Sequence, residues 1–145
     1  LKGIAAVLIG KALFGDDGQL CAYIFVLFGH AYPVFFNFRG GKGVVCLATI
    51  LLMLDWRLFL ILLAIFIILV LGTKYISAGS VICAMLFPLI LNRMNDTPFK
   101  MIEIIALAIA VIIVVKHREN IKRIFNGTES KFAFKKSKSA DGDKK

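Results

Sequence analysis

The stretch "LFLILLAIFIILVLG", residues 58–72, is apolar on every side and carries no charged residue. A strand of a membrane β-barrel would alternate apolar and polar residues, and this stretch does not, so it predicts a transmembrane helix. The composition of the chain agrees, because 59% of its 145 residues are hydrophobic and only 19% are charged. That balance excludes an ordinary soluble domain.

Residues 58–71 form one of six apolar blocks in the chain. The blocks lie at 1–14, 20–38, 44–54, 58–71, 76–91 and 99–115. Each block is short for a bilayer, whose apolar core needs about 20 helical residues, so flanking residues must extend several of them. We therefore predict an all-α fold, a polytopic transmembrane helix bundle with six membrane segments.

The cations of the chain predict its orientation. If all six blocks cross the membrane, one face keeps only Lys11, Arg57, Arg93 and Lys100 of the 18 lysines and arginines. Lys and Arg near the ends of membrane spans are retained on the cytoplasmic side. Both ends of the chain are therefore expected in the cytoplasm.

The block at 44–54 is the weak point of this topology, because 11 helical residues reach only about 16 Å. One alternative is a re-entrant helix, and another is fusion with the block at 58–71 into one long helix. Fusion would place "KHRENIKR" (residues 116–123) on the face opposite "RGGKG" (residues 39–43), and the charge distribution argues against it. We predict a short helix that connects the two faces.

The stretch "FNFRGGKGVV", residues 36–45, predicts an anion site. Its polar centre consists of Gly40, Gly41, Lys42 and Gly43. Glycines tolerate positive φ and leave backbone N–H groups uncovered, and a helix that begins near Val44 adds unpaired N–H groups and the positive end of its dipole. Lys42 adds a mobile charge, so the site suits phosphate. The alternative is a flexible glycine turn.

This loop is not a Walker A motif. The pattern G-x-x-x-x-G-K-[ST] would need glycine at Phe36 and a hydroxyl residue at Gly43. The phosphate site that we predict therefore belongs to another class.

A second polar cluster follows the last apolar block, in "VVKHRENIKRIFNGTE" (residues 114–129). Its candidate ligand-binding side chains are His117, Arg118, Asn120 and Arg123, and Glu119 and Glu129 could hold the cations in place. The predicted topology brings this cluster to the same face as the glycine loop. The alternative is a solvated basic stretch that is attracted to anionic lipid.

Three further polar side chains lie in or beside apolar blocks. His30 precedes Pro33 in "GHAYPVF", where it is either functional or hydrogen-bonded to a kinked backbone. Ser77 and Ser80, in "TKYISAGS", could bond a ligand or the carbonyl four residues earlier. The cysteines have no metal-like spacing, so no metal site is predicted.

The segment "GHAYPVFFNFRGGKGVV" (residues 29–45), followed later by "KHRENIKRIFNGTE" (residues 116–129), resembles the PlsY family of bacterial acyl-phosphate:glycerol-3-phosphate acyltransferases. The resemblance covers residues 1–129, which we take as a single acyltransferase domain. The remaining residues, 130–145, are charged and are expected to form a disordered, basic cytoplasmic tail.

The resemblance implies a reaction, a location and partners. A fatty acyl group passes from acyl phosphate to the 1-hydroxyl of glycerol 3-phosphate, which gives lysophosphatidic acid and phosphate without a cofactor. The partners are acyl phosphate, glycerol 3-phosphate, membrane lipids and, functionally, an enzyme that produces acyl phosphate, but not nucleic acid. The family lies in the bacterial cytoplasmic (inner) membrane as a multi-pass protein, with its active site and C-terminus facing the cytoplasm.

The resemblance also implies roles for individual residues. The expected phosphate-binding residues are Gly40, Gly41, Lys42, Gly43, Ser77 and Arg118. The expected catalytic residues are His117, Lys42 and Asn120, and those expected to give structural support are His30, Ser80 and Glu129. Acyl phosphate is already activated, so positioning and charge stabilisation suffice. Either His117 or the leaving phosphate can accept the hydroxyl proton, and the resemblance favours the phosphate.

The family fold is expected to have seven helices, one more than this chain predicts. Ahead of the position that corresponds to Leu1, the family carries another helix and a cytoplasmic loop that contributes a Ser and an Arg to the site. We therefore expect an N-terminally incomplete chain that inserts in a membrane without catalysing appreciable acyl transfer. The alternative functions are a non-catalytic protein that binds anionic lipid and a small transporter.

Overall fold

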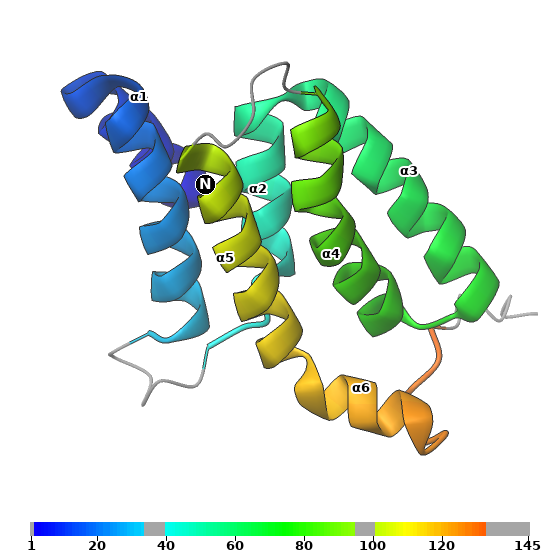
Figure 1. Cartoon of the computed structure of the whole chain (residues 1–145). Coiled ribbons are helices and arrows are strands. Elements are labelled where there is room, and N and C mark those ends of the chain that lie inside the picture. Colours follow the sequence, from blue (N-terminus) through cyan, green and yellow to red (C-terminus); the bar gives the residue numbers. More distant parts are fainter. Residues whose placement is uncertain (1, 34–39, 95–100, 133–145) are drawn as a thin grey trace, which may run out of the picture.

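A computed structural model describes residues 2–33, 40–94 and 101–132. Arg39, Lys100 and most of the predicted tail lie outside these residues. The described residues form helices and no strand, which confirms the all-α prediction (Figure 1). The helices are α1 (Lys2–Ala31), α2 (Val44–Leu54), α3 (Trp56–Thr73), α4 (Ile76–Met94), α5 (Met101–Lys116) and α6 (Arg118–Phe125).

Helix α1 is a hairpin of two antiparallel arms, residues 2–13 and 16–31. The turn between them is made by Phe14 (φ −134°, ψ 16°) and Gly15 (φ 64°, ψ −146°), which are not helical. The arms touch where Gly10 faces Gly18, because a Cβ on Gly10 would lie 2.6 Å from the Gly18 carbonyl oxygen. The two blocks that the sequence predicts at 1–14 and 20–38 are thus separate helical segments.

Gly15 provides a test of this hairpin. Its backbone lies in a region open almost only to glycine, so we expect Gly15→Ala to destabilise the fold by about 1 to 3 kcal/mol. The measurement is thermal unfolding of the purified protein in detergent. Gly72→Ala in α3 is the matched control, because its new methyl would meet nothing within 4 Å. Equal melting temperatures for wild type and Gly15→Ala would contradict the hairpin.

Helices α2 and α3 are separated by a single extended residue, Asp55 (φ −155°, ψ 118°). Its side chain accepts a hydrogen bond of 2.7 Å from the Arg57 backbone N–H and so caps α3. The chain turns back at this residue, and α3 runs antiparallel to α2 (Figure 1). The prediction of a separate short helix is confirmed, and the fused long helix is excluded.

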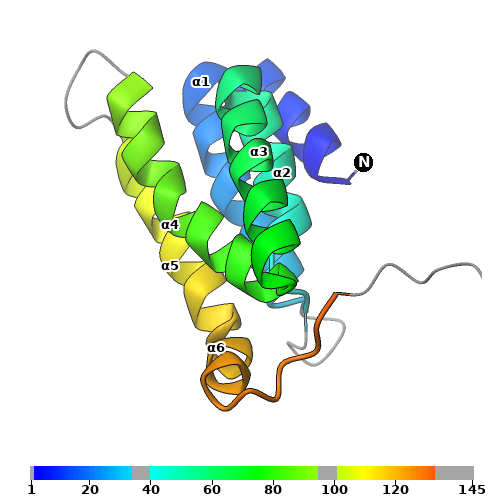
Figure 2. The same ribbon diagram turned by 90° about the vertical axis from the view of Figure 1, so that its right-hand side faces the viewer.

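The helical segments run alternately up and down, so their ends gather at two opposite ends of the bundle (Figures 1 and 2). We call one of these the basic end, which comprises residues 32–33, 40–43, 73–77 and 116–132. Two bonds tie its parts together: the Phe132 backbone N–H donates to the Lys74 carbonyl at 2.7 Å, and the Lys116 ammonium donates to the Ala31 carbonyl at 2.7 Å. Helix α6 lies across this end.

The packing of the bundle suits a membrane. Helix α4 packs against both α3 and α5, and Ala84 and Phe87 on it are almost completely buried. Large apolar side chains such as Phe25 and Ile68 point outward, as expected where lipid replaces water. Among the described residues, α3 (56–73) and α4 (76–94) are each long and apolar enough to span a bilayer. Residues 3–31 also have sufficient length and hydropathy, but the turn at Phe14 and Gly15 divides them into two shorter arms. Six membrane segments therefore stay a prediction.

Candidate active site

The glycine loop, residues 40–43, lies so close to α1 that its three glycine positions have no room for side chains. A Cβ on Gly40 would lie 2.7 Å from the Ala31 carbonyl oxygen, and one on Gly41 would collide with the His30 ring. At Gly43 it would lie 2.7 Å from Leu27, and the positive φ of 81° there also favours glycine. Close packing thus favours glycine at all three positions, and backbone conformation adds to this at Gly43.

Helix α2 begins directly after this loop. Gly43 is its N-cap, its carbonyl accepts the Leu47 N–H at 2.8 Å, and no side chain caps it among the described residues. The N–H groups of the first turn are therefore left without intrahelical partners and carry the positive end of the helix dipole. Lys42, beside them, is exposed. This is the arrangement that the sequence predicts for a phosphate.

His117 lies at the junction of α5 and α6 and is only 1% exposed. Its Nδ1 donates a hydrogen bond to the Ile113 carbonyl at 2.8 Å, so in the neutral ring Nε2 carries a free lone pair. Burial lowers the pKa of His117 below its usual 6.5; the bond to Ile113 opposes this, the Lys42 charge lowers the pKa further, and the Glu129 carboxylate opposes it again.

The glycine loop and the α5–α6 junction therefore meet. Besides the influence of Lys42 on His117, a Cβ on Gly43 would lie 3.6 Å from the Ile113 side chain. The two motifs are separated by about 75 residues of sequence, yet the fold brings both to the basic end. Their N–H groups, ammonium and imidazole can act on one bound anion.

The proximity of Lys42 and His117 is testable without substrate. We expect the His117 pKa in detergent to lie below 6.5, and we expect Lys42→Ala to raise it because a nearby positive charge is removed. The measurement is an NMR titration of the labelled imidazoles, since the chain has only two histidines. His117→Gln assigns the signal. A His117 pKa that does not change in Lys42→Ala would separate the two residues.

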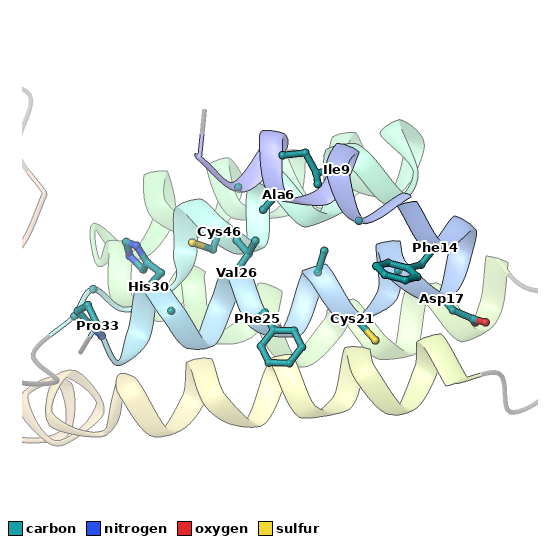
Figure 3. A pocket seen from close by; sticks show the side chains of 17 residues that line it. Ala6, Ile9, Phe14, Asp17, Cys21, Phe25, Val26, His30, Pro33 and Cys46 are labelled. Atoms are coloured by element: carbon teal, nitrogen blue, oxygen red, sulfur yellow. The ribbon is translucent and has the colours of Figure 1, made fainter. Parts of the chain in front are cut away.

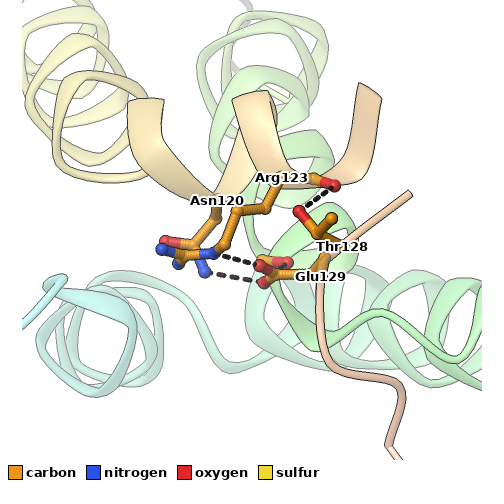
Figure 4. Close-up of polar contacts among 5 residues, drawn as sticks. Asn120, Arg123, Thr128 and Glu129 are labelled. Carbon is orange, nitrogen blue, oxygen red and sulfur yellow. Dashed lines mark hydrogen bonds and ion pairs between the residues drawn. The ribbon is translucent and has the colours of Figure 1, made fainter. Parts of the chain in front are cut away.

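Glu129 accepts hydrogen bonds from three side chains at the basic end, and Figure 4 shows those from Asn120 and Arg123. Ser77 Oγ and Asn120 Nδ2 each donate to Oε1 at 2.7 Å, and Arg123 Nε donates to Oε2 at 2.8 Å. The bond from Arg123, followed by those from Ser77 and Asn120, lowers the pKa of Glu129 to about 2. The segment after α6 is thereby fastened to the start of α4.

The other predicted site residues lie in different surroundings. Ser80 is buried and donates to the Ile76 carbonyl at 2.9 Å, which is the i−4 alternative. Arg118 is exposed and lies 3.5 Å from Glu119. The His30 ring rests against Gly41. The structure therefore gathers Lys42, His117, Asn120 and Ser77, and it places Arg118 on the outer surface of α6.

A groove of about 1260 Å³ runs along α1 and ends at the glycine loop (Figure 3). Its lining includes Ala6, Phe25, Val26, His30 and Cys46, and its far end lies at Phe14 and Asp17. The groove was not predicted from the sequence. The only sequence signal for it is a series of small residues on α1, which lets the two arms approach closely.

The geometry defines a class: a helical membrane protein whose basic end combines a glycine loop, the start of a helix and an exposed lysine beside an apolar groove. The family model for glycerol-3-phosphate acyltransferase matches residues 1–127. The chain is 44% identical to the glycerol-3-phosphate acyltransferase of Thermoanaerobacter sp. (strain X514), over 93% of this chain and 67% of that protein. It is 40% identical to the Geobacter sulfurreducens protein of the same name, over 91% and 68%.

The fold is similar to that of a solved acyltransferase. The crystal structure of PlsY (YgiH), an integral membrane glycerol 3-phosphate acyltransferase, in its glycerol 3-phosphate form, matches with a TM-score of 0.81 at 30% identity, over 91% of this chain and 66% of that chain. A lysophosphatidic acid form matches equally well. The chain belongs to the glycerol-3-phosphate acyltransferase family, and it spans about two thirds of the length of these relatives.

Proposed function

We propose that the protein transfers a fatty acyl group from acyl phosphate to the 1-hydroxyl of glycerol 3-phosphate, with lysophosphatidic acid and phosphate as products. The observation that carries this proposal is the meeting of the glycine loop and its Lys42 with the buried His117, whose pKa burial lowers. Family membership and the fold shared with PlsY support the same conclusion.

The reaction needs positioning more than a protein nucleophile. The 1-hydroxyl oxygen attacks the acyl carbonyl carbon, the bond from that carbon to the phosphate oxygen breaks, and the hydroxyl proton passes to the departing phosphate. The N–H groups of Gly40, Gly41 and Gly43 and the Lys42 ammonium hold phosphate and stabilise the developing charge. His117 Nε2 accepts a hydrogen bond from the glycerol hydroxyl and orients it.

Two of the expected ligands have bonds that limit their roles. Ser77 gives its hydroxyl hydrogen to Glu129, so it offers phosphate only lone pairs in this arrangement. Asn120 uses one amide hydrogen on Glu129 and keeps the second for substrate. We therefore assign Ser77 to orientation of Glu129 and keep Asn120 as a substrate donor. Arg118 is exposed, with its Nε 3.5 Å from Glu119, so its role as a phosphate ligand stays a prediction.

The groove along α1 supplies a place for the acyl chain. From residue 17 to residue 30, the second arm of α1 rises about 20 Å, which is the length scale of a fatty acyl chain. The groove lining is mainly apolar, and one end of it is formed by Gly40 and Gly41. An acyl chain lying there would bring its phosphate to the glycine loop.

The test is an assay of phosphate and lysophosphatidate formation from palmitoyl phosphate, with and without glycerol 3-phosphate. The chain in nanodiscs is assayed alone and after co-expression with the N-terminal helix and loop of a relative; whichever preparation turns over is called the active preparation. We expect little turnover by the chain alone, and equimolar products that require glycerol 3-phosphate after co-expression. Saturable binding of anionic lipid without turnover in either preparation would favour the lipid-binding alternative.

The cytoplasmic location of the basic end is a separate prediction. Single cysteines at Thr73 and Ser130, in a protein without its native cysteines, should be shielded from an impermeant thiol reagent in intact cells. A cysteine at Asp96, in the connection between α4 and α5, should be labelled from outside. The measurement is mass spectrometry of the labelled protein. Labelling at position 73 from outside would contradict this orientation.

A further inference from the structure

The Lys116 side chain joins α5 to the end of α1. Its ammonium donates a 2.7 Å hydrogen bond to the Ala31 carbonyl and lies 4.4 Å from the centroid of the Tyr32 ring. The last carbonyls of a helix lack intrahelical partners and carry its negative dipole end, which suits a cation. Ala31 is fully buried, so water weakens this contact less than it would at an open surface.

The same end of α1 supports the glycine loop from the other side. A Cβ on Gly40 would collide with the carbonyl oxygens of His30 and Ala31, and one on Gly41 would collide with the His30 ring. The Ala31 carbonyl therefore lies between Lys116 and the loop. A shift of this carbonyl would move the surface on which Gly40 rests.

We propose that Lys116 is a positioning residue, which fixes the glycine loop at the correct distance from His117 by holding the end of α1. His117 follows Lys116 directly in the chain, so one side chain sets the spacing of both halves of the site. Lys116 acts through Ala31 and Tyr32 and does not touch substrate. This inference rests on the proposed function in that the positioned loop is the phosphate-binding one.

The first test measures the position of the loop without any activity. Trypsin cleavage between Lys42 and Gly43, followed by mass spectrometry, reports how often the loop leaves α1. Loss of a charge-assisted hydrogen bond should make this cleavage about tenfold faster in Lys116→Met. Lys116→Arg should restore most of the protection. Lys122→Met is the matched control, because Lys122 is exposed and pairs only with Glu119 at 3.8 Å among the described residues.

Tyr32→Leu provides a second variant that leaves the Lys116 charge in place. It removes the aromatic face under the ammonium and should accelerate cleavage in the same direction by a smaller factor. If Lys116→Met does not fold, this variant decides the question. The proposal would be overturned if a folded Lys116→Met were cleaved at Lys42 at the wild-type rate. If Lys116→Met does not fold, an unchanged cleavage rate in Tyr32→Leu would overturn it.

The second test is a double-mutant cycle in the active preparation. Lys116→Met should lower kcat/KM about tenfold, mainly through KM for glycerol 3-phosphate, and should have less than about a twofold effect once Lys42 is alanine. Fully additive losses would mean that Lys116 does not act through the loop. If no preparation turns over, the proposed function fails, and the proteolysis experiment still decides whether Lys116 holds the loop.

Discussion

Lys42→Ala is expected to lower kcat/KM for glycerol 3-phosphate roughly ten- to 150-fold, which corresponds to about 1.5 to 3 kcal/mol of lost transition-state binding. The physical reason is the loss of a charge-assisted contact with phosphate beside the glycine loop and the start of α2. The active preparation provides the measurement. Lys42→Arg should recover only part of the loss, because its planar guanidinium fits the tight glycine seat poorly.

The control for this prediction is Lys122→Ala, which removes an exposed cation from the same end of the bundle. It should change kcat/KM little, because its pairing with Glu119 is a surface one. If the Lys42→Ala variant kept near-normal kcat/KM, the phosphate role of the loop would be wrong. Equal losses in both variants would point to a general effect of positive charge at the membrane surface.

Glu129→Ala should lower activity about 10²-fold, because loss of the shared acceptor displaces the catalytic groups by a distance on the order of 1 Å. The variant leaves Ser77 and Asn120 without their acceptor, and both are largely buried. Each unsatisfied group costs about 1 to 3 kcal/mol, so the melting temperature should fall as well. Glu119→Ala, at an exposed carboxylate of α6, is the matched control.

The contribution of the Glu129 carboxylate to stability should also depend on pH. The Glu129 pKa is about 2 in the folded protein, whereas the usual pKa of a glutamate side chain is 4.5. A group with a lowered folded pKa stabilises the fold above its unfolded pKa and loses that contribution as the pH falls through the folded value. The wild-type protein should therefore lose stability as the pH falls from 4.5 to 2. Glu129→Gln has no carboxylate at this position, so it should lack this contribution at every pH. Parallel melting curves of wild type and Glu129→Gln over this range would contradict the network.

The sequence predicted the helical blocks and the meeting of the two polar motifs. The blocks were visible because long apolar runs are separated by short polar stretches, and the charge distribution favoured a break between α2 and α3. The charge distribution then placed residues 40–43 and His117 at one end of the bundle. The roles of individual site residues stay predictions that the experiments above test.

The network of Glu129 and the bond from Lys116 to Ala31 could not be predicted from spacing. Ser77 and Glu129 are 52 residues apart in the chain, and Lys116 and Ala31 are 85 apart. Their contacts depend on how α6 crosses the end of the bundle and on the angle between α1 and α5, which local patterns do not determine. The groove along α1 depends in the same way on the contact of Gly10 with Gly18.

The central claim is that the glycine loop and the α5–α6 junction form one site for the phosphate of glycerol 3-phosphate. It is tested most directly by titrating glycerol 3-phosphate into the detergent-solubilised protein while the His117 imidazole signal is followed by NMR. The account predicts a saturable shift of the His117 signal, with a dissociation constant that rises roughly ten- to 150-fold in Lys42→Ala. Saturable binding that leaves the His117 signal unmoved, or binding that is equally tight in Lys42→Ala, would contradict it.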